Sequence, residues 1–267
     1  MKNESWVDEA WEGFLTDKWD KRPKNQEIVY YTSKDLYPYL EKYTQSGEGE
    51  IRIFHYGHEK RRPVLKRGII KIPITRSKWA LVKRPGSLSF SEPTETGKIN
   101  SETLTDGMKI ILHNSIETRT NPGETSLLAI AKHVGVINDF YDLKDTMAMF
   151  TGGRQNALGC ELQINGLPID LSKAQVEIDG GFEGPKTAVI VEMKSSLKQD
   201  NFDPNQCLIP WLKWKKLLTD KKVYSMVLLC EIKNRNVEYW AYNLDQENNN
   251  SPFEMKITKG KKYILKF

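Results

Sequence analysis

The feature that most limits the possible folds is a series of strand-like runs in the second half of the chain, with one predicted helix among them. The runs include AVIVEMK (188–194) and KVYSMVLLCEI (222–232), followed by VEYWAYNL, FEMKI and KYILKF. Between the first two, Asp203 and Pro204 form a favourable start for a helix that we expect to run toward Leu218. This order of strand, helix and strand predicts an α/β (α+β) fold with a central mixed β-sheet flanked by helices, and it argues against a helical bundle.

Shorter signals add to this sheet. The runs CELQI and QVEID are expected as further strands of the central sheet, GGFEGPKT as a hairpin-like connection, and TGGRQ (151–155) as a turn. Apolar residues recur at helical spacing after Glu124, which predicts one amphipathic helix over about 124–140.

The first 110 residues are expected to form a separate region. The spacing of apolar residues predicts a helix from about Trp6 to Leu15, and a second helix is expected over about 34–43. From 51 to 83 the pattern is strand-like. Two helices followed by a β-ribbon are, by analogy, a winged-helix-like arrangement. We therefore predict two domains, residues 1–110 and 111–267, joined near a segment rich in Pro, Gly, Ser and Thr (85–107).

The charge is distributed very unevenly. Residues 60–84 contain ten Lys or Arg and no acid, while the whole chain has a net charge of only +5. Such a block is typical of proteins that bind the phosphate backbone of nucleic acids. The alternative is a solvated basic face without a partner. Because the cations alternate with apolar residues such as Trp79, the block is expected on a folded surface and favours nucleic acid.

Several classes of protein are not expected. No stretch approaches about 18 uncharged apolar residues, so a membrane span is not predicted. The first residues lack the pattern of a signal peptide, and three widely spaced cysteines fit a reducing, cytoplasmic setting rather than a disulfide framework. There is no P-loop and no GxGxxG, so no nucleotide cofactor is expected.

The residues that point to chemistry lie in VEIDGGFEG and the AVIVEMK run that follows it. Asp179 is predicted to end an apolar strand, and Glu192 and Lys194 are two residues apart near the end of the next strand. Alternate residues of a strand face the same side, so Glu192 and Lys194 are expected to point together, with Met193 toward the core. If the two strands pair as a hairpin, Asp179 comes near Glu192.

Two neighbouring carboxylates repel each other unless one is protonated or a cation lies between them. Oxygen ligands suit Mg²⁺, which also binds substrate phosphate oxygens. With an ammonium beside them, these residues predict a site for phosphodiester hydrolysis. The alternative is a solvated hairpin carrying a surface Glu–Lys pair that contributes about 0–1 kcal/mol.

The segment VEIDGGFEG…AVIVEMK resembles the active-site motif of the PD-(D/E)xK nuclease superfamily, with Asp179 in the D position and Glu192-x-Lys194 as ExK. It is more narrowly similar to a group of type II restriction endonucleases. The likeness covers roughly residues 110–267 and is fainter before them. Asn205 stands where that group tends to have arginine, which is a departure from the pattern.

The resemblance implies a restriction-endonuclease-like core that cleaves double-stranded DNA at a specific sequence with Mg²⁺, for which Mn²⁺ may substitute, as a homodimer. It implies catalytic roles for Asp179, Glu192, Lys194 and the helical Glu124. It implies metal ligation by Asp179, Glu192 and the backbone carbonyl of Met193. A structure-specific or repair nuclease, and a non-catalytic DNA-binding protein with a relict core, remain alternatives.

Further residues are expected to support this site. Glu177 shares the face of Asp179 and either joins the site or is an ordinary polar position, and Glu183 is expected in the hairpin turn. The residues expected to contact DNA are Lys60, Arg61, Arg62, Lys66, Arg67, Arg76, Lys78, Trp79 and Gln206.

Overall fold

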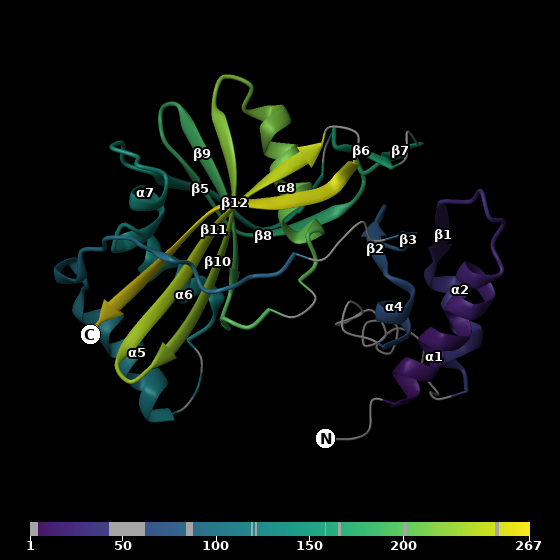
Figure 1. The fold of residues 1–267 in the computed structure, drawn as a ribbon, viewed down its shortest axis with the longest axis horizontal. Coiled ribbons are helices and arrows are strands. Elements are labelled where there is room, and N and C mark those ends of the chain that lie inside the picture. The colour runs from purple at the N-terminus through teal and green to yellow at the C-terminus, as the bar shows by residue number, and fades with distance from the viewer. Residues whose placement is uncertain are drawn as a thin grey trace.

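The computed structural model describes residues 5–42, 62–83, 88–118, 120, 122–157, 159–164, 167–199, 202–248 and 251–267. The described chain forms a smaller N-terminal part up to residue 83 and a larger part from residue 88 onward, which lie side by side (Figure 1). In the described residues, no helix is long and apolar enough to cross a membrane.

The larger part is built on a seven-stranded mixed sheet with the order β4-β12-β11-β10-β9-β8-β5. Strands β9 and β10 run parallel and are joined through α8, while β8–β9, β5–β8, β10–β11 and β11–β12 are antiparallel. The predicted α/β class with a central mixed sheet flanked by helices is confirmed. The strands are β4 (Glu95–Thr96), β5 (Ala148–Asn156), β8 (Gln175–Glu183), β9 (Thr187–Lys194), β10 (Lys222–Lys233), β11 (Asn236–Asn248) and β12 (Ser251–Lys266).

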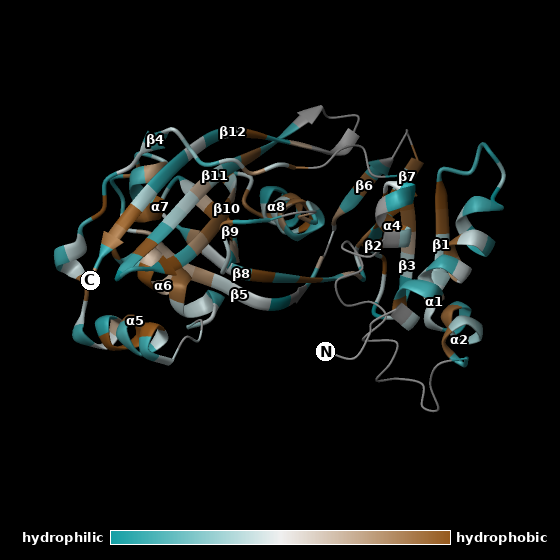
Figure 2. Ribbon diagram, turned by 60° about the horizontal axis from the view of Figure 1, so that its bottom comes forward, coloured by the Kyte–Doolittle hydropathy of each residue, from teal (hydrophilic) through white to brown (hydrophobic). Residues whose placement is uncertain are grey.

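Helices cover both faces of this sheet (Figure 2). On one face, the core contains apolar residues of α6 (Glu124–His133) and α7 (Val136–Phe140), together with Leu112 of α5 (Asp106–Thr118) and Met193 of β9. On the other face, α8 (Asn205–Leu217) packs its buried residues against β10 and β11. The sheet is therefore buried from both sides, as the continuous apolar runs of β9 and β10 require.

The N-terminal part contains a three-stranded antiparallel sheet with the order β1-β3-β2. Helix α1 packs one face of this sheet through Trp11 and Phe14, which are fully buried. The strands are β1 (Ile28–Thr32), β2 (Ile69–Pro73) and β3 (Lys78–Lys83), and the helical elements are α1 (Ser5–Leu15), the π-helix η1 (Thr16–Asp20), α2 (Ser33–Leu40) and α4 (Arg62–Arg67). Two helices and a β-ribbon were predicted here, but α4 was not, and residues 51–61 of the expected ribbon lie outside the described residues.

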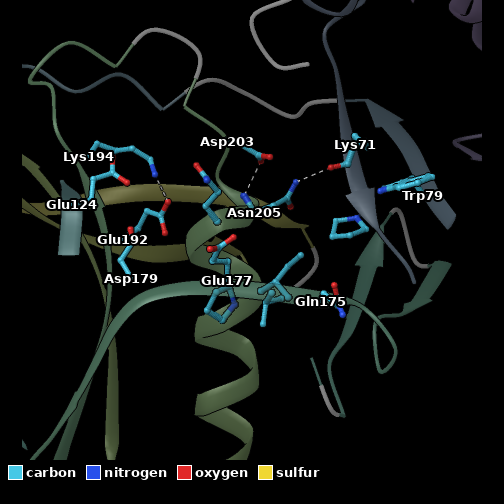
Figure 3. A pocket seen from close by; sticks show the side chains of 15 residues that line it. Lys71, Trp79, Glu124, Gln175, Glu177, Asp179, Glu192, Lys194, Asp203 and Asn205 are labelled. Carbon is cyan, nitrogen blue, oxygen red and sulfur yellow. Dashed lines mark hydrogen bonds and ion pairs between the residues drawn. The ribbon is translucent and has the colours of Figure 1, made fainter. Parts of the chain in front are cut away.

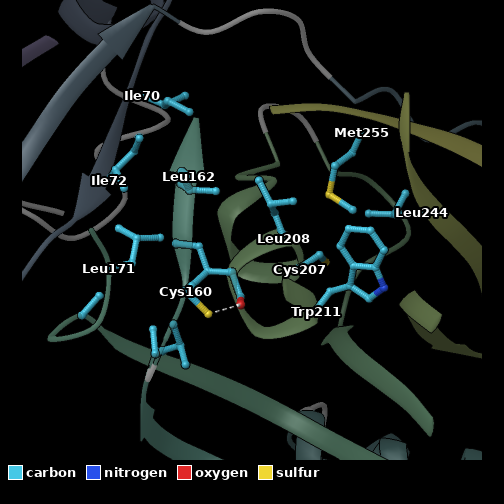
Figure 4. Packing of buried hydrophobic residues seen from close by; sticks show 14 of the residues in the cluster. Ile70, Ile72, Cys160, Leu162, Leu171, Cys207, Leu208, Trp211, Leu244 and Met255 are labelled. Atoms are coloured by element: carbon cyan, nitrogen blue, oxygen red, sulfur yellow. Dashed lines mark hydrogen bonds between the residues drawn. The ribbon is translucent and has the colours of Figure 1, made fainter. Parts of the chain in front are cut away.

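One core joins the two parts. The opposite face of the N-terminal sheet buries Ile70 and Ile72 against Leu162, Leu171 and Leu208 of the larger part (Figure 4). This apolar contact fixes the N-terminal sheet beside α8. The predicted domain boundary at residue 110 falls inside α5, and β4 before it already pairs with β12.

Three local predictions were wrong. TGGRQ is part of β5 rather than a turn, because register shifts around Thr151 and Gly153 absorb its glycines within the strand. CELQI forms β6 (Glu161–Ile164), which pairs with β7 (Leu167–Asp170) in a separate sheet rather than joining the central one. The expected helix over 124–140 is two helices, because Gly135 adopts a left-handed conformation with φ 89°.

Candidate active site

The site is built on the hairpin of β8 and β9. Asp179 was expected at the end of its strand, but β8 continues through Gly180 and Gly181 to Glu183. These glycines pair with Val191 and Ile190 of β9, so Asp179 lies directly beyond the paired segment. Its carboxylate accepts a hydrogen bond of 2.7 Å from the backbone N–H of Met193. The hairpin thus brings Asp179 near Glu192, as the sequence predicted.

Glu192 and Lys194 project from the same side of β9. Their side chains are 6% and 19% exposed, and the Lys194 ammonium lies 2.5 Å from Glu192 Oε1. Met193, between them, is fully buried in the core against the α6 side of the sheet, as expected. A surface Glu–Lys pair is therefore excluded, because both charged groups have lost most of their contact with water.

Glu124 reaches the same place from the first residue of α6. Its Oε1 accepts a hydrogen bond of 3.2 Å from the backbone N–H of Ser195, which directly follows Lys194. Gly123 before it has φ 87°, a conformation that turns the chain into the helix at this point. The structure therefore brings Glu124 together with the three residues of the motif.

The electrostatics of this cluster are strained by burial. The pKa of the Glu192 carboxyl is raised to about 8: burial is the largest cause, Lys194 opposes the shift, and the nearby charges of Asp179 and Glu124 add to it. Burial tends to lower the pKa of the Lys194 ammonium, but the carboxylate of Glu192 outweighs it, so that pKa is raised. Lys194 therefore stays protonated. Its charge does not offset the effect of burial on Glu192, so the Glu192 carboxyl does not ionise readily at neutral pH.

All four residues line one open cavity of about 460 Å³ (Figure 3). Its floor is formed by alternate residues of β8 and its far wall by residues of α8 and the N-terminal sheet. The lining residues are Lys71, Pro73, Trp79, Glu124, Gln175, Val176, Glu177, Asp179, Glu192, Lys194, Asp203, Asn205, Gln206, Ile209 and Pro210. A cavity of this size that exposes carboxylates and cations can admit a charged, extended substrate.

The far wall contains residues that sequence reasoning did not assign to the site. Asn205 is 6% exposed, and its Nδ2 donates a 3.3 Å hydrogen bond to the backbone carbonyl of Lys71 in β2. Its backbone N–H donates to Asp203 Oδ1 at 3.0 Å. The Asp–Pro signal predicted the start of this helix, but the sequence held no signal for its contact with β2, which lies more than a hundred residues away.

A family model described as Domain of unknown function (DUF6997) matches residues 94–264. The chain belongs to the DUF6997 family. No curated protein and no solved structure matches this chain. The DUF6997 segment contains Glu124, Asp179, Glu192 and Lys194, whereas Lys71 and Trp79 of the far wall lie outside it.

The residues predicted to contact DNA are divided by the structure. Trp79 and Gln206 line the cavity, together with carboxylates of the DUF6997 segment. Arg76 is exposed in the turn between β2 and β3, and Lys78 is exposed as the first residue of β3. Lys66 is exposed on α4. Lys60 and Arg61 lie outside the described residues, and Arg62 is the first residue of α4.

Arg67 was predicted to contact DNA, and the structure gives it a different role. Its guanidinium forms ion pairs of 2.8 Å with Glu12 and 2.6 Å with Asp20, and its side chain is 14% exposed. A guanidinium that satisfies two carboxylates in this way holds α4 against α1 and η1. The composition of the basic block could not reveal this, because both acids lie about fifty residues earlier in the sequence.

Glu177 and Glu183 also find partners. Glu177 is exposed and lies 3.8 Å from Arg154 across the β5–β8 pair, while lining the cavity. Glu183 forms an ion pair with Lys221 at the end of the hairpin. Glu183 was expected in the turn itself, but it is the last residue of β8.

Proposed function

We propose that this chain is a divalent-metal-dependent endonuclease that hydrolyses phosphodiester bonds in double-stranded DNA. The observation that carries the proposal is the meeting of Asp179, Glu192, Lys194 and Glu124 in one open cavity. A buried carboxyl group beside two further carboxylates is costly to maintain, and active sites are where such costs are concentrated. Cleavage at a specific sequence, a restriction-endonuclease-like core and a homodimer extend this proposal, and they rest on the resemblance of the hairpin motif.

The donor set fits Mg²⁺, with Mn²⁺ as a substitute. Asp179 and Glu192 would hold the ion with the backbone carbonyl of Met193, leaving positions for water and phosphate oxygens. Among the described residues, no three His, Cys, Asp or Glu side chains meet as a ready-made metal group. When bound, the ion would polarise a phosphoryl oxygen and promote ionisation of water.

The chain's own groups have separable tasks. The Lys194 ammonium stays positively charged beside Glu192 and faces the cavity, where it can hold an attacking water or offset negative charge on the phosphate. Glu124 is fixed by the Ser195 N–H and keeps a second oxygen for a water molecule. The N-terminal sheet supplies Lys71 and Trp79 on the other side of the cavity, where a duplex would lie.

The test is a plasmid digest with Mg²⁺. We expect wild-type protein to cut, and Asp179→Ala and Glu192→Ala to lose cutting while still binding DNA in Ca²⁺, which supports binding without turnover. Glu117→Ala, an exposed acid on α5, is the matched control and should cut normally. Undiminished cutting by either site variant would refute the assignment.

The ends of the cut DNA decide the finer function. A single repeated sequence at the ends supports a restriction-type enzyme, whereas cutting that follows branches or flaps supports a repair nuclease. Binding without any cutting by the wild type, in Mg²⁺ or Mn²⁺, would leave only a DNA-binding protein.

A further inference from the structure

The active-site cavity continues beyond the catalytic cluster. A second hollow of about 250 Å³ shares five lining residues with it, namely Pro73, Trp79, Gln175, Val176 and Glu177. Two hollows with this much common wall form one trench, which we call the β8 trench. It leads from Lys194 past Trp79 to a far end that the proposed chemistry does not use.

Strand β8 forms the floor of the β8 trench. Gln175, Glu177 and Asp179 are alternate residues of the strand, so their side chains project from the same side. Val176 and Ile178 between them are buried, as this alternation requires. Each step of two residues advances about 7 Å, so the floor extends about 13 Å from the candidate active site.

Two arginines from distant parts of the sequence line the second hollow of the β8 trench. Arg76 comes from the β2–β3 hairpin and Arg154 from β5, and both line the second hollow. Arg154 pairs with Glu177 in the strand register, but their charged atoms are 3.8 Å apart and both side chains are about two-thirds exposed (66% and 69%). A pair this open contributes little, so Arg154 can exchange Glu177 for another anion at small cost.

We propose that Arg76 and Arg154 bind a backbone phosphate of the DNA strand that is cut, and that the β8 trench guides this strand away from the catalytic cluster. This inference rests on the proposed function. Guanidinium groups bind phosphate through two parallel hydrogen bonds, which suits a repeating backbone. The distance from Asp179 to Glu177 corresponds to about two nucleotides along a duplex, at 3.4 Å per step. The anchored phosphate therefore lies a few nucleotides from the scissile bond.

The same geometry gives Glu177 a distinct role. Its carboxylate lies on the floor opposite Arg154 and two residues from Asp179, where it competes with phosphate for Arg154. Replacing this charge should strengthen DNA binding, whereas a purely structural Arg154–Glu177 pair would leave binding unchanged or weaken it.

The experiment measures binding of several duplex DNAs of unrelated sequence in Ca²⁺ over a range of salt concentrations, for wild type, Arg76→Gln, Arg154→Gln and Glu177→Gln. Each lost phosphate contact should make the plot of log binding constant against log salt less steep by about 0.9. We expect this change for both arginine variants, on every sequence tested, and tighter binding for Glu177→Gln. Arg235→Gln, an exposed arginine in the β10–β11 turn outside the trench lining, should match wild type.

The outcomes separate this proposal from the proposed function. Unchanged salt dependence in both arginine variants, or a loss confined to particular sequences, would overturn the phosphate contact even if the enzyme cuts DNA. A less steep salt dependence in both arginine variants, together with a wild type that never cuts DNA, would support the trench and reject the nuclease. A wild type that binds no DNA in Ca²⁺ would reject both.

Discussion

At the scale of single residues, the dominant feature is a carboxyl group that folding makes difficult to ionise. Glu192 is 5% exposed, and the ammonium of Lys194 forms an ion pair with its carboxylate. Asp179 and Glu124 add negative charge nearby. The protein without metal therefore stores electrostatic strain at the position where a cation would relieve it.

The first prediction concerns the pH dependence of stability without metal. The pKa of Glu192 is about 8 in the folded protein and has an ordinary value of 4.5. Protonated Glu192 therefore contributes stability that is fully present below pH 4.5 and is lost as the pH rises through 8, by about 1.4 kcal/mol per unit in between. Glu192→Gln cannot lose a proton. In EDTA its Tm should exceed that of the wild type above pH 8, and the two should converge at acidic pH.

The second prediction concerns metal. Because Mg²⁺ binds the ionised carboxylate, it must displace a proton wherever the pH lies below the pKa of Glu192. Mg²⁺ should therefore raise the Tm of the wild type more above pH 8 than well below it. Asp179→Asn should remove most of this effect at both pH values, and a Tm that responds to Mg²⁺ equally in the variant would contradict the assigned ligands.

The third prediction separates Lys194 from the carboxylates. Lys194→Met keeps the apolar stem and removes the charge that faces the cavity. Cutting should fall by about 10²–10⁴-fold, a typical contribution of a group that transfers protons or stabilises charge. DNA binding in Ca²⁺ should remain close to that of the wild type, and a proportional loss of binding would instead make Lys194 a binding residue.

At the scale of elements, the position of Asp179 depends on how closely β5 and β8 approach. A Cβ added to Gly181 would lie 2.2 Å from the Thr151 side chain, where the β5–β8 register shifts. Any other residue at this position would force the Thr151 side chain or the strands themselves to shift. Gly180 and Gly181 therefore allow close packing inside β8, whereas the sequence predicts that the strand ends at Asp179.

The fourth prediction follows from this contact. Gly181→Ala should lower the free energy of unfolding by about 1–3 kcal/mol, as overpacking does, and should also reduce cutting by displacing Asp179. Gly107→Ala is the matched control, because a Cβ at Gly107 of α5 meets no atom within 4 Å. The control should be neutral or stabilise by about 0.5–1 kcal/mol, as measured by urea denaturation.

Local patterns account for what could be predicted at this scale. Alternation in β9 placed Glu192 and Lys194 on one side and Met193 in the core, and periodicity placed Glu124 at the start of a helix. The break at Gly135 was missed because apolar spacing continues across it. Trp79 and Gln206 of the far wall were among the expected DNA contacts, but the contact of Asn205 with β2 was not predicted, because it depends on the packing of distant segments, which no local pattern encodes.

At the scale of the whole molecule, the two parts share a continuous apolar core rather than a flexible joint. Ile72 of the N-terminal sheet is fully buried among residues that include Leu208 of α8 and Leu162 of β6. Interfaces of this kind couple the unfolding of the parts that they join. The far wall of the cavity is consequently held by the same contacts that hold the fold.

The fifth prediction tests this coupling. Ile72→Ala should lower the free energy of unfolding by about 2–5 kcal/mol and should reduce hydrogen-exchange protection of α1 and α8 together. Ile110→Ala, at a residue of α5 that is 58% exposed, should change stability by no more than about 0.5 kcal/mol. Independent melting of the two parts would contradict a common core.

Part of the far wall of the cavity comes from outside the family segment, and this has an evolutionary consequence. The acidic cluster belongs to the DUF6997 segment, whereas Lys71 and Trp79 come from outside it. Relatives can therefore retain the same reactive groups and exchange the opposing wall. On the proposed nuclease function, we expect members of the family to diverge in target choice through the region before the matched segment, so that swapping this region between two members should transfer preference without rebuilding the chemistry.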